Sequence, residues 1–172
     1  MAEETPTPVF GDGAFDGSGA QQTAQFQLQK MYLKDASFEV PHAPLIYQEA
    51  AGQLDIKLHL AQKVQELGQN LFEVALTVTV TATVGEKTAY LSEVQQAGIF
   101  MISGVTDEQR AGIVNILCPN TLYPYARATV THLVSDGGFP PIVLQPISFE
   151  QLHAQRLKQQ ADTAAGDAAP AV

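Results

Sequence analysis

The side chains best suited to chemistry in this 172-residue chain are a single cysteine and four histidines. Cys118 directly precedes Pro119 at the end of an apolar stripe, whereas a reactive thiolate needs an electropositive, partly exposed setting. A free cysteine in apolar surroundings usually serves as packing, and we expect that role for Cys118. The histidines lack the spacing of metal ligands, so we expect solvated or hydrogen-bonded roles for them. They are His42, His59, His132 and His153.

The sequence also lacks the short motifs that are typical of catalytic sites. It contains no Gly-x-x-x-x-Gly-Lys-Ser/Thr loop, no His-Glu-x-x-His, no Cys-x-x-Cys and no Gly-x-Ser-x-Gly. One cysteine allows neither an internal disulfide nor a thiolate metal cluster. We therefore expect no cofactor, no bound metal and no enzyme activity.

The charge balance is acidic. Eighteen Asp and Glu against nine Lys and Arg give a formal net charge of −9 and a pI near 4.7. Such a chain repels phosphate, which argues against nucleic acid as a partner, and attracts basic segments. The start Met1-Ala2-Glu3-Glu4 carries acids where a secretory signal has bases, and no run of about 20 apolar residues follows. We expect a cytoplasmic protein without direct membrane insertion.

Period-two patterns predict four strands. The clearest runs from Leu71 to Val84, where one face is almost all valine and the other is threonine. Weaker alternations cover 26–32 and 54–60, and a fourth strand returns over 88–101 after the turn at 85–87. We expect an interruption of that strand near 96–98. Strands followed by helices indicate an α+β fold, a four-stranded antiparallel sheet with helices on one face.

Two capping boxes predict where the helices begin, at Thr106 and at Ser148. The first opens a long helix in which Pro119 and Pro124 interrupt the apolar stripe, so the pattern leaves open one bent helix or two. Gly137-Gly138 ends it. The second opens a short C-terminal helix to about residue 160. Residues 1–23 and 161–172 have the composition of disordered tails, which leaves 24–160 as one domain.

The apolar stripe of the long helix is too wide for one sheet face. It contains Ile113, Ile116, Leu117, Val130, Leu133 and Val134. Because exposed apolar area favours association at about 25 cal/mol per Å², we expect this helix to be sandwiched between sheets of different subunits.

Three segments in order carry a family resemblance. They are Lys34-Asp35-Ala36-Ser37-Phe38-Glu39-Val40-Pro41, Tyr90-Leu91-Ser92-Glu93-Val94-Gln95-Gln96-Ala97-Gly98-Ile99-Phe100, and Cys118-Pro119-Asn120 with Tyr123-Pro124-Tyr125-Ala126-Arg127. Together they resemble the SecB protein-export chaperone family. The resemblance implies a homotetramer, a dimer of dimers, that holds unfolded precursor proteins translocation-competent without ATP and delivers them to the SecA motor.

The resemblance also implies a docking site for SecA. Residues that match Asp35, Glu39, Leu91 and Glu93 help to dock the basic, zinc-containing tail of SecA in the family, and the zinc belongs to that partner. Strand periodicity puts Asp35 with Glu39, and Leu91 with Glu93, on one side of their respective strands. If both sides join the threonine-lined face, that face is polar and acidic around one leucine.

Candidate linings of a client-binding groove are Tyr90, Tyr125, Ile142, Leu144 and Leu152. For the tyrosines a core position and a groove position both stay open, and for Val143 we favour the core. Members of the family often have a Trp before the second strand. This chain has none, Ala50-Ala51-Gly52 occupies the region, and Tyr47 is a possible replacement. Only three large apolar residues anchor the last helix, so we also expect that it can move over a groove.

Two other functions remain open. One is a SecB-like chaperone dedicated to a single partner, such as a toxin–antitoxin client. The other is an acidic oligomeric module that binds a ligand in an enclosed pocket.

Overall fold

The computed structural model describes residues 24–49 and 53–166, with side chains up to residue 161. The expected N-terminal tail, residues 50–52 and the end of the expected C-terminal tail lie outside the described residues. The elements, in chain order, are β1 (Gln25–Glu39), α1 (Ile46–Glu49), β2 (Asp55–Gly68), β3 (Leu71–Val84), β4 (Lys87–Ser103), α2 (Asp107–Gly112), the π-helical turn η1 (Ile113–Leu117), α3 (Cys118–Asp136) and α4 (Phe149–Gly166).

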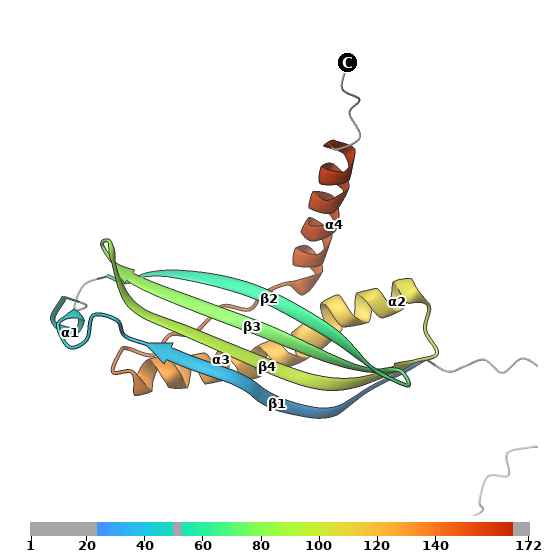
Figure 1. Ribbon diagram of the computed structural model, residues 1–172, viewed down its shortest axis with the longest axis horizontal. Coiled ribbons are helices and arrows are strands. Elements are labelled where there is room, and N and C mark those ends of the chain that lie inside the picture. Colours follow the sequence, from blue (N-terminus) through green and yellow to red (C-terminus); the bar gives the residue numbers. More distant parts are fainter. Residues whose placement is uncertain (1–23, 50–52, 167–172) are drawn as a thin grey trace, which may run out of the picture.

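The four strands form one antiparallel sheet in the order β1-β4-β3-β2 (Figure 1). This confirms the predicted fold class and the four-stranded sheet. The predicted bounds of β3 match the structure, and β2 runs eight residues further than the predicted 54–60.

The expected interruption of β4 near residues 96–98 is wrong. Gln96, Ala97 and Gly98 pair continuously with β3 on one side and with β1 on the other. A Cβ on Gly98 would lie 2.8 Å from the Phe100 ring, so this glycine permits close packing and does not break the strand.

The irregularities of the sheet edge lie on β1 instead. Gln29 and Lys34 are extra residues opposite β4, and each forms a β-bulge. Because a bulge reverses the alternation, Phe26 and Leu28 share the inner face with Met31 and Leu33. Tyr32 therefore lies on the opposite face from Phe26, contrary to the alternation read from the sequence.

The long helix is continuous from Asp107 to Asp136, so the structure selects one joined helix over two. Its capping box is confirmed: Gln109 N–H donates to Thr106 Oγ1 (3.2 Å) and Thr106 N–H donates to Gln109 Oε1 (2.9 Å). Pro119 has no N–H for the carbonyl of Asn115, four residues earlier, and Asn115 lies within η1, where the hydrogen-bond pattern changes. The helix ends at Gly137, and Gly138 has a φ of +81°, as the glycine pair predicted.

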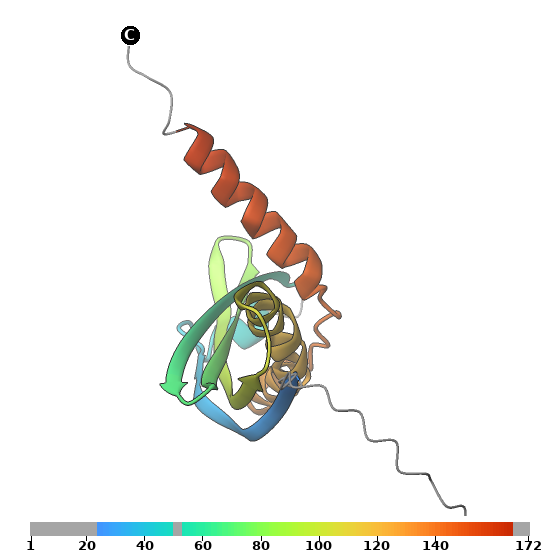
Figure 2. The same ribbon diagram turned by 90° about the vertical axis from the view of Figure 1, so that its right-hand side faces the viewer.

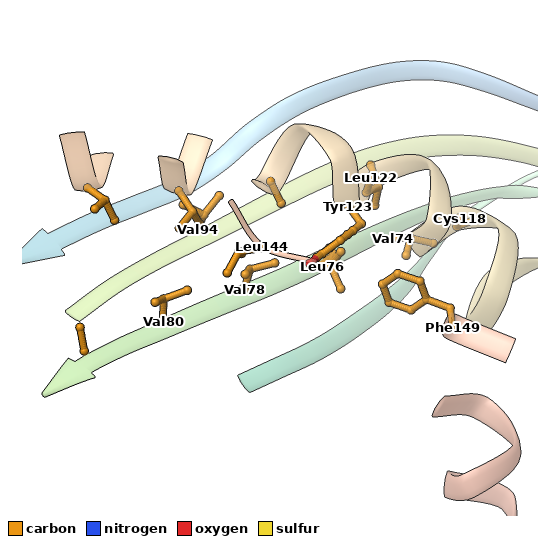
Figure 3. Close-up of a cluster of buried hydrophobic side chains, with 14 of the residues drawn as sticks. Val74, Leu76, Val78, Val80, Val94, Cys118, Leu122, Tyr123, Leu144 and Phe149 are labelled. Carbon is orange, nitrogen blue, oxygen red and sulfur yellow. The ribbon is translucent and has the colours of Figure 1, made fainter. Parts of the chain in front are cut away.

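The core lies between α3 and the inner face of the sheet, mainly over β3 and β4 (Figures 1 and 2). Figure 3 shows Val74, Leu76, Val78 and Val80 of β3 beneath residues of the helix and of the segment that follows it. Cys118 is fully buried in this cluster, which confirms its packing role.

Helix α4 is longer than predicted and continues through 161–166, the first part of the expected tail. Ser148 caps it, since its Oγ accepts from Gln151 N–H (3.2 Å), but Ser148 Oγ itself donates to Glu150 Oε2 (2.9 Å). Beyond its first turn, α4 extends away from the sheet and does not cover it (Figures 1 and 2). Leu157 on this helix is 52% exposed.

Candidate partner-binding surfaces

The outer face of the sheet is the face opposite the long helix, and its register brings the predicted docking residues together. Glu39 on β1 pairs with Leu91 on β4. Ser37 pairs with Glu93, and Asp35 pairs with Gln95. Paired residues point to the same side of a sheet, and the threonines of β3 continue this face, because Thr79 pairs with Glu93. Asp35, Glu39, Leu91 and Glu93 therefore share one surface, which we call the acidic face.

The acidic face is open to solvent and has a defined charge arrangement. Asp35, Glu39 and Glu93 are exposed, and Leu91 is half-buried. Thr79 Oγ1 donates to Glu93 Oε2 (2.9 Å) and so fixes that carboxylate toward β3. Lys57 on β2 pairs with Thr81, which places a cation at the far side of the same face. The negative charge is thus concentrated at the end of β1 and β4 that carries Glu39, Leu91 and Glu93, whereas Lys30 and Lys34 lie further along β1 on the same face.

A second charged group on the outer face was missed by the sequence reasoning. Glu73 of β3 is only 8% exposed. Lys34 Nζ donates to both of its carboxylate oxygens (2.8 and 2.7 Å), and the Tyr32 hydroxyl also donates to it. Mainly because of the Lys34 hydrogen bonds, the pKa of Glu73 lies below its usual value, whereas its hydrogen bond raises the pKa of Tyr32 to about 12. The only sequence signal was a carboxylate inside an otherwise apolar run.

Of the candidate client-binding residues, Tyr90 lies in the core. It is fully buried and its ring is 5.5 Å from Phe38 and 4.8 Å from Phe139. Burial raises the pKa of Tyr90, and its hydroxyl has no hydrogen-bond partner among the described residues. Tyr47 packs on Phe139 at 5.1 Å and donates to the Gly137 carbonyl (2.9 Å), so it does join an aromatic cluster.

The candidate residues in the segment between α3 and α4 differ in burial. Leu144 is buried and Ile142 is half-buried, whereas Val143, for which we expected a core position, is 74% exposed. This expectation was wrong because successive side chains of an extended segment point in opposite directions. Leu152 is half-buried in the first turns of α4.

Tyr125 is the most exposed of the five predicted client-binding residues, at 55%, and it lines an apolar groove of about 560 Å³ between β1 and α3. Leu28, Met31 and Leu33 of β1 line the opposite wall. A second groove, of about 500 Å³, runs along the solvent side of the long helix, where Ile113, Ile116 and Leu117 lie. Within one chain, the structure does not bring the five predicted client-binding residues into a single groove.

The described part of the chain, 24–49 and 53–166, contains neither a cluster of metal ligands nor a membrane-spanning helix. No three His, Cys, Asp or Glu side chains cluster there in a way that could hold a metal ion. No helix there has the length and apolar character needed to cross a membrane.

Comparison with known proteins gives consistent matches. The family model described as Preprotein translocase subunit SecB matches residues 19–160. The protein-export protein SecB of Xanthomonas campestris is 46% identical over 162 residues, with 93% of this chain and 95% of that protein covered. The protein-export protein SecB of Alkalilimnicola ehrlichii is 47% identical, with coverages of 94% and 85%.

The fold is also found in a solved structure, a SecB-like chaperone of Mycobacterium tuberculosis in complex with a peptide from the HigA1 antitoxin. Its TM-score is 0.61 at 20% identity, with 72% of this chain and 91% of that chain covered. The general class is thus an α+β protein related to the export machinery. The chain belongs to the SecB family of protein-export chaperones.

Proposed function

We propose that this chain is a cytoplasmic holding chaperone that keeps unfolded precursor proteins competent for export and passes them to the SecA motor. The observation that carries the proposal is the division of the molecule into two kinds of surface. Apolar grooves lie on the helix side, and the acidic face lies on the opposite side of the same sheet. One chain can therefore hold a client and contact a basic partner at the same time.

The grooves support binding of non-native chains by their chemistry. Unfolded chains expose apolar side chains that folded proteins bury, so an apolar groove selects them without reading sequence. Each ordered client residue costs about 1–2 kcal/mol of backbone entropy, which burial at about 25 cal/mol per Å² offsets only narrowly. Several grooves acting together supply the avidity, and Tyr125 is the lining residue most available to a client.

Such cooperation requires several copies of the chain, and we propose a homotetramer built as a dimer of dimers. The N-terminal part of the apolar stripe supports this, since Leu117 is 43% exposed and Ile113 and Ile116 are only half-buried. The C-terminal part does not, because Val130 and Val134 are fully buried within one chain. Light scattering at low micromolar concentration should give four times the 18.4 kDa chain mass. A stable monomer would refute the assembly.

The acidic face is proposed as the docking site for SecA. Carboxylates on an exposed face raise the encounter rate with a basic segment and make binding sensitive to salt, and Leu91 adds an apolar contact at the centre. The main test is aggregation of a slow-folding precursor with and without the chaperone, followed by transfer to SecA. If the chain does not suppress aggregation, the proposed holding function is wrong. If it suppresses the aggregation of one client only, the alternative of a SecB-like chaperone dedicated to a single partner is favoured.

Two variants test the docking site itself. Leu91→Arg and Glu93→Lys should each weaken SecA binding at least about tenfold, since each places a cation among the carboxylates, while client holding stays intact. Glu66→Lys is the matched control, because Glu66 is exposed on β2 but pairs with Phe72 on the helix side. Unchanged SecA affinity in Glu93→Lys would remove the assignment.

A further inference from the structure

The cluster of Glu73, Lys34 and Tyr32 lies beside the acidic face. Tyr32 and Lys34 belong to β1 and Glu73 to β3, so their hydrogen bonds cross over the intervening strand β4. Ala97 of β4 pairs with Tyr32 on one side and with Ala75 of β3 on the other, whereas Glu73 pairs with Ile99 of β4. Ala97 is fully buried and Ala75 is 2% exposed. The hydrogen bonds thus cross the sheet beside one row of small residues.

Lys34 is also the extra residue of a β-bulge, and Asp35 follows it directly. If the strand alternated strictly from Leu33, Lys34 would face outward and Asp35 would share the inner face with Leu33. Because Lys34 is the extra residue, Asp35 instead takes the next outward position, opposite Gln95. The bulge therefore puts Lys34 and Asp35 on the same side of β1. Their charges are opposite, and an unrestrained lysine could reach the neighbouring carboxylate.

We propose that Glu73 is a positioning residue for the acidic face: it holds the Lys34 ammonium over β4 and so keeps it from neutralising Asp35. The two hydrogen bonds of 2.8 and 2.7 Å direct Lys34 toward β3, and the Tyr32 hydroxyl occupies the same carboxylate. Lys34 itself is 37% exposed and Glu73 11% exposed by side chain, so the carboxylate is the fixed partner of the pair. This inference rests on the proposed SecA docking function and names a residue outside the docking surface that sets its charge.

The test uses the full-length chain and measures affinity for SecA by titration. Glu73→Gln should weaken binding about threefold, the scale of one exposed ion pair, because the freed Lys34 then pairs with Asp35. Lys34→Met/Glu73→Gln should restore the parent affinity, because no ammonium remains to be released. A purely structural role predicts the opposite, since the double variant has lost both partners.

Three further measurements serve as controls. Glu66→Gln, which removes one carboxylate from the helix side of the sheet, should leave the affinity unchanged. Lys34→Met alone should bind at least as tightly as the parent, and it tests the idea even if Glu73→Gln fails to fold. Light scattering of each variant should show the parent assembly.

The outcomes separate this inference from the proposed function. Parent-like binding by Glu73→Gln, no rescue in the double variant, or weaker binding by Lys34→Met overturns the role of Glu73. If Glu93→Lys still weakens binding in that case, SecA docking at the acidic face stands. If Glu93→Lys also binds normally, the docking proposal fails as well.

Discussion

Gly137 at the end of α3 allows a sharp test of the packing between the helix and β1. The Phe38 ring of β1 packs directly against this glycine: a Cβ added to Gly137 would lie 2.1 Å from Phe38 Cε1 and 2.4 Å from Cζ. These separations are far below van der Waals contact, so Gly137→Ala must displace the ring. Phe38 in turn stacks on Tyr90 at 5.5 Å and contacts Phe139 at 6.5 Å. The strain is therefore passed to the aromatic cluster.

The loss of stability in Gly137→Ala follows from the volume of the added methyl group. Forcing an extra methyl group into a packed site costs about 1–3 kcal/mol, and the full range applies because the ring is held on several sides. Gly112, in the same continuous helix, is the matched control: a Cβ there meets nothing within 4 Å. Gly112→Ala should instead raise the free energy of unfolding by up to about 1 kcal/mol, the gain in helix propensity.

Urea denaturation at one fixed protein concentration measures both variants, because the stability of an oligomer depends on concentration. A cycle with Phe38→Ala isolates the clash, since Gly137→Ala should cost little once the ring is gone. An equal cost in both backgrounds, or a Gly137→Ala variant as stable as the parent, would refute the reasoning.

Three other predictions concern buried polar groups. Burial raises the pKa of the Cys118 thiol to about 12, so iodoacetamide at pH 8 should label the native protein hardly at all and the urea-unfolded protein readily. Tyr90→Phe should raise the free energy of unfolding by about 1 kcal/mol in urea titrations, because it removes a buried hydroxyl without a partner in the described part of the chain; a destabilised variant would contradict this. Glu73 has a pKa below its ordinary 4.5, so it stabilises the fold above that pH, and the stabilisation is lost as the pH falls through the folded-state pKa. Glu73→Gln should therefore unfold more easily than the parent at pH 7, with the difference shrinking below about pH 4.5, and a pH-independent difference would contradict it.

The strands that were easiest to predict are those whose side chains are sorted by burial. In β3, strict alternation of valine with threonine reflects one face in the core and one in solvent, and its bounds were predicted correctly. In β2, an edge strand, residues 61–68 are mostly exposed on both faces. Residues 55–60 are equally exposed but alternate apolar with polar side chains, whereas 61–68 do not, so the sequence underestimated the length of that strand.

The candidate site shows the same division. Local periodicity placed Asp35 with Glu39, and Leu91 with Glu93, on one side of their own strands. Only the strand register shows that both sides belong to the same face of the sheet. Glu73 could not be found in this way, because its partners are 39 and 41 residues away and only the strand order brings them together. The alternation over 26–32 was weak because the bulge at Gln29 reverses it, and no local rule locates that bulge.

The π-helical turn η1 allows the long helix to hold one extra residue without a change of phase. A wide turn contains about one residue more than a regular α-helical turn. A one-residue deletion within 113–117 would let regular geometry return while α2 and α3 keep their relative orientation. The same deletion inside the regular part of α3 would instead rotate the residues on one side of it by about 100°. Homologues that are one residue shorter at η1 should therefore present the same side of α2 to their neighbours.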